Sequence, residues 1–99
     1  MYANIVFPIA SFRVFIYKVP NHLQGYLHVG CAVNVLFKNK SAIGYIESFI
    51  KDSPYKGKIN FIKSVHQSQS IPKDLWKTIV WMSNYYITPI GLCIKSAIP

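Results

Sequence analysis

Basic and aromatic residues alternate along much of the chain, a combination that suits the binding of single-stranded nucleic acid. Cations can contact phosphates while aromatic faces stack on bases of any sequence. The residues concerned are Phe12, Arg13, Phe15, Tyr17, Lys18, Phe37, Lys38, Tyr45, Tyr55, Lys56, Lys58, Phe61 and Lys63. A domain of 99 residues also needs large aromatic side chains in its core. Part of this set must therefore be structural.

Catalytic chemistry has little support in the residue types present. The chain has only three acidic residues, and their spacing offers no pair of carboxylates for acid–base catalysis. His22, His28 and His66 do not stand at metal-ligand intervals from either cysteine. The five glycines form neither a GxGxxG nor a P-loop motif. We therefore expect no enzymatic activity from this chain alone.

The net charge is the strongest global signal in the composition. Eleven Lys and Arg against three Asp and Glu give a net charge of +8 and a pI near 9.7, as is usual in proteins that bind polyanions. The segment from Lys38 to Lys63 holds six lysines and two acids, and so carries half of this charge. A hydrophobic content of 52% excludes a disordered tail. The alternative is a basic surface that only aids solubility.

The first two-thirds of the chain predict short antiparallel strands. Alternating apolar residues indicate strands over 2–7, 13–18, 32–37 and 42–50, and a last, partly alternating strand between Ile59 and Val65. The segment Asn39-Lys40-Ser41 is expected to turn the third strand into the fourth. Five short strands joined by tight turns predict a small, barrel-like antiparallel sheet over residues 2–65.

The final third of the chain predicts helices. Ser70 suits an N-cap, Pro72 a first turn and Asp74 the positive end of the helix dipole. Apolar residues then recur at helical intervals, and they predict an amphipathic helix over about 71–86 with Trp76, Val80 and Tyr86 on its buried face. A further helical turn is expected over 90–97. The predicted fold class is α+β, mostly β.

Signals for cell compartment are few. The stretch Met1 to Phe12 carries no charge, unlike a secretory signal, and neither long uncharged stretch offers the roughly 20 apolar residues of a membrane span. Cys31 and Cys93 lie far apart without a CxxC motif and are expected to be buried thiols. These features predict a cytoplasmic protein without membrane contact. The apolar end at Ile98-Pro99 predicts a domain cut from a longer protein.

Four stretches of the chain carry a resemblance to a known family. They are Ala3–Pro8, Phe12–Pro20, Gly30–Lys38 followed by Ile43–Ile46, and Asn84–Gly91 followed by Ser96–Pro99. In this order and spacing, the chain resembles the N-terminal, 3′-end DNA-binding domains of the PriA family of bacterial replication-restart helicases, also called primosomal protein N′. The match runs from residue 3 to residue 99. Its most specific parts are the pair Tyr85-Tyr86 and the strand that contains Val33, Val35 and Phe37.

The resemblance implies a site that captures the 3′ end of the nascent leading strand, whatever the terminal base. The aromatic residue that packs against the terminal nucleotide falls on Phe15. The neighbouring aspartate, whose carboxylate accepts a hydrogen bond from the 3′-hydroxyl, falls on Ile16. A pocket glycine falls on Lys38, and a lysine falls near Asn60. Three of the four positions therefore differ from the family, and weaker phosphate contacts are expected from Lys40, Lys56 and Lys58.

The resemblance also implies partners and cofactors. We expect residues 1–99 to form a single, monomeric domain that binds DNA, either forked or single-stranded, with a 3′ end. Other primosome proteins or single-strand-binding proteins would be reached through a longer parent, an ATP-dependent 3′–5′ DNA helicase. No cofactor is expected in this chain, because ATP, magnesium and zinc belong to the parent. Two alternatives remain open: a protein-interaction domain that has lost the pocket and binds an acidic partner, and a general basic binder of single-stranded nucleic acid.

Overall fold

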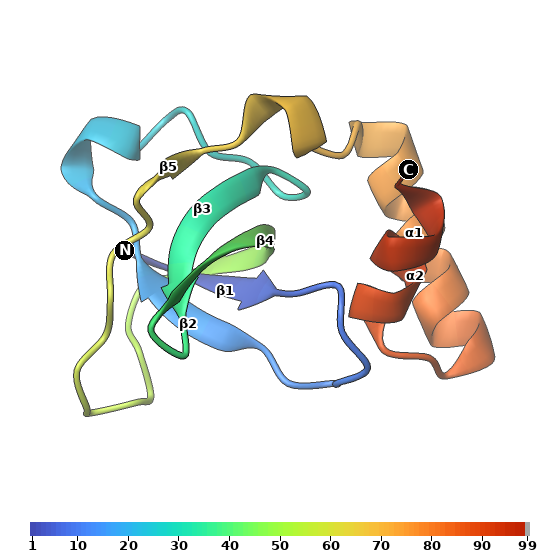
Figure 1. The fold of residues 1–99 in the computed structure, drawn as a ribbon, viewed down its shortest axis with the longest axis horizontal. Helices are drawn as coiled ribbons and strands as arrows, with labels where there is room; N and C mark the ends of the chain where they lie inside the picture. Colours follow the sequence, from blue (N-terminus) through green and yellow to red (C-terminus); the bar gives the residue numbers. More distant parts are fainter. Residues whose placement is uncertain (99) are drawn as a thin grey trace.

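The computed structural model describes residues 1–98, in which a curled sheet packs against two helices (Figure 1). The strands are β1 (Tyr2–Val6), β2 (Phe15–Lys18), β3 (Ala32–Phe37), β4 (Lys40–Ile50) and β5 (Ser64–Val65). The helices are α1 (Lys73–Tyr86) and α2 (Ile90–Ala97), and short 3-10 helices lie at Asn21–Leu23 and Gln67–Gln69. The predicted fold class is confirmed. Pro99, which ends the last stretch of the resemblance, lies outside the described residues.

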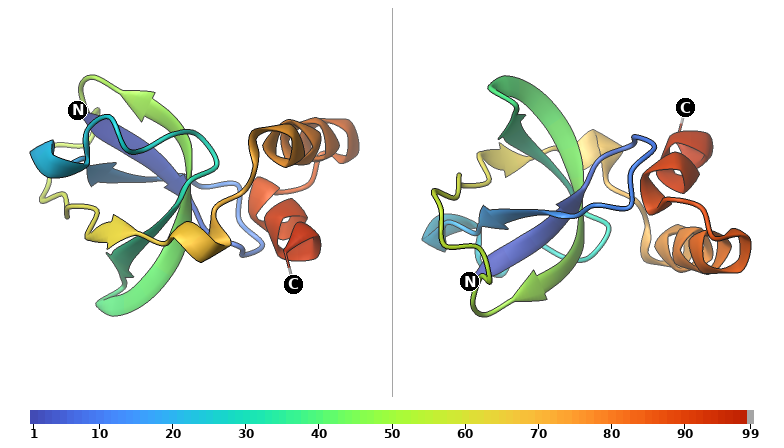
Figure 2. Two further views of the ribbon diagram at one scale, coloured as in Figure 1. Left: turned by 90° about the horizontal axis from the view of Figure 1, so that it is seen from above. Right: turned by 90° about the horizontal axis from the view of Figure 1, so that it is seen from below.

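The strands form one antiparallel sheet in the order β2-β1-β4-β3-β5. The sheet curls strongly, as the two views in Figure 2 show, but it is not closed into a barrel within residues 1–98. A single parallel bridge, from Lys18 to Phe61, connects the outer edge of β2 to the chain that precedes β5. The Lys18 N–H donates to the Asn60 carbonyl, and the Ile62 N–H donates to the Lys18 carbonyl, both at 2.9 Å. These bonds hold the segment around Asn60 against β2.

Each face of the sheet has its own apolar core, because successive side chains of a strand point to opposite faces. The core inside the curl includes Ile5, Val33, Val35 and Ile46. The core on the other face joins the sheet to both helices, and it consists of Val6, Ala32, Tyr45, Ile71, Trp76, Ile79, Cys93 and Ile94. The expectation that both cysteines are buried thiols is confirmed.

A β-bulge in β4 changes which of its residues face the helices. Asn4 of β1 pairs with Ser48, whereas the next residue, Ile5, pairs with Ile46, so Glu47 is an extra residue in β4. An extra residue shifts the alternation of the strand by one position. As a result, Ile46 and Phe49, three residues apart, both belong to the inner core. Glu47, two residues after Tyr45 of the helix-side core, lines a cavity on the helix side.

Several of the predicted strand boundaries are wrong: β1 ends one residue earlier than predicted, at Val6, and β4 begins two residues earlier, at Lys40. β2 begins at Phe15 rather than at residue 13, and the last strand contains only Ser64–Val65. The β3–β4 hairpin turns at Lys38 and Asn39, one residue earlier than predicted. Both residues adopt positive φ angles, 52° and 64°, as the favoured two-residue hairpin turns require.

Helix α1 ends at Tyr86 as predicted, but its beginning and one residue of its buried face differ from the prediction. It begins at Lys73 rather than at residue 71, and Pro72 occupies the N-cap position without a side-chain hydrogen bond. The Ser70 hydroxyl instead accepts a hydrogen bond of 3.0 Å from the Ala32 N–H. Trp76 is buried as predicted, but Tyr86 is 63% exposed. Tyr86 follows the buried Ile79 by seven residues and so shares its side of the helix, but it is the last residue of α1 and lies beyond the core.

Residues 1–98 contain neither a membrane-spanning helix nor a cluster of metal-ligating side chains. None of the helices in this part of the chain has the length and apolar character needed to cross a membrane. In the same residues, no three His, Cys, Asp or Glu side chains gather where they could hold a metal ion.

Candidate nucleic-acid interface

A cavity of about 450 Å³ opens at the edge of the sheet that β2 forms, and we call it the basic cavity. Its walls come from residues 13–17 in and before β2, from residues 36–38 of the β3–β4 hairpin, and from residues 55 and 58–60 of the loop after β4. The backbone hydrogen bonds of Lys18 with residues 60 and 62 hold this loop beside β2. Segments distant in the sequence therefore meet at one site.

Phenylalanine rings form the aromatic wall of the basic cavity. Phe15 and Phe37 meet edge to face with their ring centroids 4.9 Å apart, and Phe7 stacks on Phe37 from inside the curl at 4.2 Å. Such contacts hold the rings in defined orientations. Phe15 and Phe37 are only partly buried, so apolar surface remains for contact with a base or a sugar.

Positively charged side chains surround this aromatic wall. The Arg13 guanidinium lies 5.0 Å from the centroid of the Phe15 ring, and Lys38 Nζ lies 5.4 Å from that of Phe37. Lys58 also lines the cavity, and no aspartate or glutamate does. Three cations without a carboxylate make the basic cavity attractive to phosphate groups.

A buried tyrosine fixes the spacing of two of the cavity walls. The Tyr17 hydroxyl donates a hydrogen bond of 2.6 Å to the Leu36 carbonyl and so ties β2 to the end of β3. Burial raises the pKa of Tyr17 above its ordinary value. The hydroxyl therefore stays protonated at neutral pH and remains a hydrogen-bond donor.

The backbone of Lys38 has a conformation that favours glycine. Its φ angle of 52° lies in the left-handed region, which costs most residues about 1–2 kcal/mol because Cβ approaches the following carbonyl oxygen. The resemblance aligns a glycine with this position. Lys38 thus accepts a strained backbone and adds a charge beside the Phe37 ring.

The structure brings the predicted pocket residues together. Phe15, Ile16, Lys38 and Asn60 all line the basic cavity, and so does Lys58. Lys40 and Lys56, for which weaker phosphate contacts are predicted, are exposed and do not line it. Their contribution to binding, like that of the pocket residues, stays a prediction.

Arg13, Phe37 and Tyr55 also line the basic cavity, and the sequence does not single them out. They belong to the long set of alternating basic and aromatic residues, which is too large to select a site. Tyr55 is 60% exposed, and its backbone N–H donates to the Ser53 hydroxyl at 3.0 Å in a local turn. This turn holds its ring at the loop side of the cavity.

Comparisons with known proteins agree with this geometry. A family model described as the PriA 3′DNA-binding domain (3′BD) matches residues 4–99. The replication restart protein PriA of Rickettsia conorii is 32% identical over 98 residues, which are 98% of this chain and 15% of that protein. The PriA proteins of Buchnera aphidicola and Chlamydia pneumoniae are 28% and 29% identical over 97% and 100% of this chain. The chain spans 13–15% of the length of these relatives.

Proposed function

This chain belongs to the family of PriA 3′DNA-binding domains, and from that membership we propose that it binds the 3′-terminal nucleotide of a DNA strand in the basic cavity. One observation carries the proposal. The four positions that the resemblance assigns to the pocket, residues 15, 16, 38 and 60, come from three separate segments and line a single cavity. That cavity has three cations and no carboxylate in its walls, so it suits the phosphates that flank a terminal nucleotide.

Binding in this cavity is independent of the terminal base. Arg13, Lys38 and Lys58 are available to phosphates, which carry no sequence information. Phe15 offers an apolar ring, and every base has a face that can pack on one. The terminal nucleotide is thus held by its backbone and by the shape of its ring rather than by hydrogen bonds to the base edge.

Within a full-length restart protein, the domain engages the 3′ end of the nascent leading strand at a stalled or repaired fork. The ATP-dependent helicase activity, with its magnesium and zinc, belongs in this proposal to the remainder of that protein. Contacts with other primosome or single-strand-binding proteins also occur through the remainder. The domain itself acts as a monomer in the cytoplasm.

Removing a single lysine from the cavity tests the proposal. We expect Lys58→Ala to weaken binding of a 5′-labelled oligonucleotide about tenfold, the order expected for one charge-assisted contact. Lys95→Ala is the matched control, because Lys95 is exposed on α2 and lies outside the cavity. It removes the same charge and should change the affinity less than twofold. Fluorescence anisotropy at fixed salt measures both.

The alternatives give different results in the same experiment. Equal losses for Lys58→Ala and Lys95→Ala would contradict a defined pocket and favour a general basic binder. If the unmodified domain binds an acidic peptide but not DNA at low salt, the protein-interaction alternative is favoured instead.

A further inference from the structure

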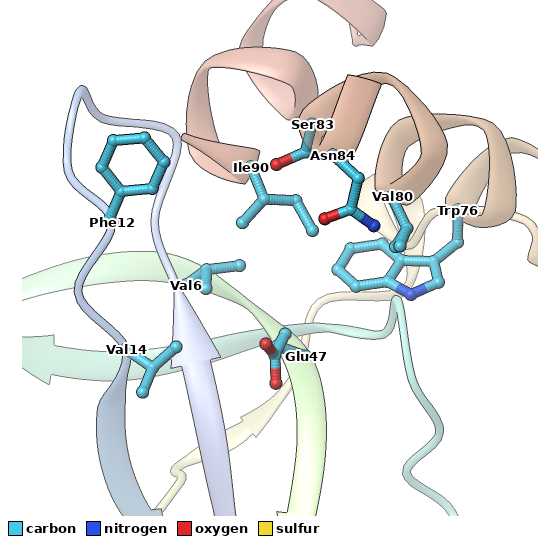
Figure 3. A pocket seen from close by; sticks show the side chains of 9 residues that line it. All are labelled: Val6, Phe12, Val14, Glu47, Trp76, Val80, Ser83, Asn84 and Ile90. Carbon is cyan, nitrogen blue, oxygen red and sulfur yellow. The ribbon is translucent and has the colours of Figure 1, made fainter. Parts of the chain in front are cut away.

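A second cavity, of about 500 Å³, lies between the sheet and the two helices (Figure 3). We call it the helix-side cavity. Its walls are mainly apolar, and they are formed by Val6, Phe12, Val14, Trp76, Val80 and Ile90. Three polar side chains also line it, those of Glu47, Ser83 and Asn84. The cavity therefore offers apolar surface for packing together with a few polar groups at defined places.

Glu47 gives this cavity an electrostatic character opposite to that of the basic cavity. It is one of only three acids in a chain of net charge +8. It is half-buried and lies on the helix side of β4, two residues after Tyr45 of the helix-side core. The Ser48 hydroxyl donates a short hydrogen bond to Glu47 Oε1, and no lysine or arginine lines the cavity. A half-buried carboxylate is stabilised by a ligand that donates hydrogen bonds to it, and it repels phosphate.

Trp76 and Asn84 contribute different surfaces to the cavity. The Trp76 ring lines it and adds apolar surface. Figure 3 shows the Asn84 amide directed into the same space. The Ser83 hydroxyl is already used, because it donates to the Thr88 carbonyl at 2.6 Å.

The two cavities share a wall. Val14 lines both, whereas its neighbours Phe12 and Arg13 line the helix-side cavity and the basic cavity respectively. Phe12 is 70% exposed, so its ring has a free face. Arg13 belongs to the segment that separates the cavities, where its guanidinium can bind the phosphate between two nucleotides.

We propose that the helix-side cavity receives the base of a second nucleotide, next to the one held in the basic cavity. The inference rests on the proposed function of the basic cavity. The flat ring of a base packs against Phe12 and the apolar wall, and its exocyclic amino group donates to the Glu47 carboxylate. The Asn84 amide donates to an acceptor of the base, and the Trp76 ring adds to the apolar wall. The linking phosphate stays outside, with Arg13.

This arrangement predicts a base preference at the second position. Adenine, cytosine and guanine carry an exocyclic amino group, and thymine does not. Cytosine and thymine have rings of the same size, so comparing them isolates the amino group. We expect an oligonucleotide with thymine next to the terminal nucleotide to bind about fivefold or more weakly than one with cytosine there. The two oligonucleotides otherwise have the same sequence and are titrated by fluorescence anisotropy.

Glu47→Gln tests the residue that carries the preference. The neutral amide can both donate and accept, so it should bind cytosine and thymine about equally. Asp74→Asn is the matched control, because it removes the same charge from an exposed position of α1 and should leave the preference intact.

A 2-aminopurine at the second position reports stacking directly, and Phe12→Ala should reduce its fluorescence change on binding. Circular dichroism verifies that each variant is folded.

Equal affinities for cytosine and thymine in the unmodified domain would overturn the inference, as would a preference that survives Glu47→Gln. Neither result touches the proposed function, which depends on the loss of affinity in Lys58→Ala. Conversely, a base preference that persists while Lys58→Ala binds normally would overturn the proposed function of the basic cavity.

Discussion

At the turn between β3 and β4, Lys38 has a backbone conformation that favours glycine and a charge that faces the basic cavity. We expect Lys38→Gly to raise the free energy of unfolding by about 1 kcal/mol, because glycine adopts a positive φ without strain. The same change should weaken DNA binding severalfold, since it removes one of three cations. Urea unfolding and anisotropy measure the two effects. Lys40→Gly, in β4, should instead destabilise the fold by about 0.5–1 kcal/mol.

Ile16 bears on which chemical group the domain accepts at the 3′ end of the DNA. A carboxylate at this position would attract a 3′-hydroxyl through a charge-assisted hydrogen bond and repel a 3′-phosphate. Isoleucine does neither, and the cations of the basic cavity can accept a terminal phosphate. We therefore expect the unmodified domain to discriminate poorly between the two ends or to favour the phosphate. Ile16→Asp should shift the preference toward the hydroxyl by about 10- to 150-fold, as for a bond of roughly 1.5–3 kcal/mol.

Oligonucleotides that differ only at the 3′ end measure this preference. A 5′-phosphorylated strand serves as the control, because it adds the same charge at the other end. A preference of tenfold or more for the hydroxyl in the unmodified domain would contradict the prediction. It would assign the missing acceptor to another group, such as the Asn60 side chain.

The sequence alone predicts some of the residues that line the two cavities but not others. The resemblance finds Phe15, Ile16, Lys38 and Asn60, because each has a defined place in a recognisable strand or loop. It does not find Tyr55, whose position depends on backbone hydrogen bonds between Lys18 and the chain around Asn60. Glu47 follows Tyr45 of the helix-side core by two residues, so strand alternation gives its side, whereas the cavity that it lines depends on how α1 and α2 pack over the sheet.

Among the elements, α1 depends most on a single side chain. Trp76 is buried between the sheet and α2, so we expect Trp76→Ala to lower the free energy of unfolding by about 3–5 kcal/mol. That is a large part of the total stability of a small domain. Tyr86→Ala is the control, because that side chain is 63% exposed and its loss should cost less than about 0.5 kcal/mol. Thermal and urea unfolding measure the stability of both variants. Near-normal stability of Trp76→Ala would contradict the packing of α1 through this side chain.

The strands were easier to predict than the helix face or the closure of the sheet. Alternation in a strand has a period of two, so one buried residue determines the orientation of its neighbours. Tyr86 shares the helix face of the buried Ile79 but is the last residue of α1, so periodicity alone places it among the buried residues in error. Whether a curled sheet closes depends on long-range pairing of its edges, which here is limited to the bridge between Lys18 and Phe61.

Across the whole molecule, charge is separated between two adjoining cavities. Arg13, Lys38 and Lys58 line the basic cavity, and no acidic residue does. Glu47 lines the helix-side cavity, and no lysine or arginine does. A DNA strand that crosses the shared wall can thus place its phosphates at the basic cavity and a nucleobase in the helix-side cavity. The separation follows from the sheet itself, because the basic cavity lies at the edge that β2 forms and Glu47 lies on the face that the helices cover.

The salt dependence of binding follows from this arrangement. If three cations contact phosphates, log affinity should fall against log salt with a slope of about −2 to −3, because each contact releases roughly 0.7–0.9 of a counterion. Lys58→Ala should reduce the magnitude of the slope by about 0.7–0.9, whereas Lys95→Ala, outside the cavity, should leave it unchanged. Anisotropy titrations over a range of salt concentrations measure the slopes. An affinity that is insensitive to salt would show that the cations of the basic cavity do not contact the DNA backbone.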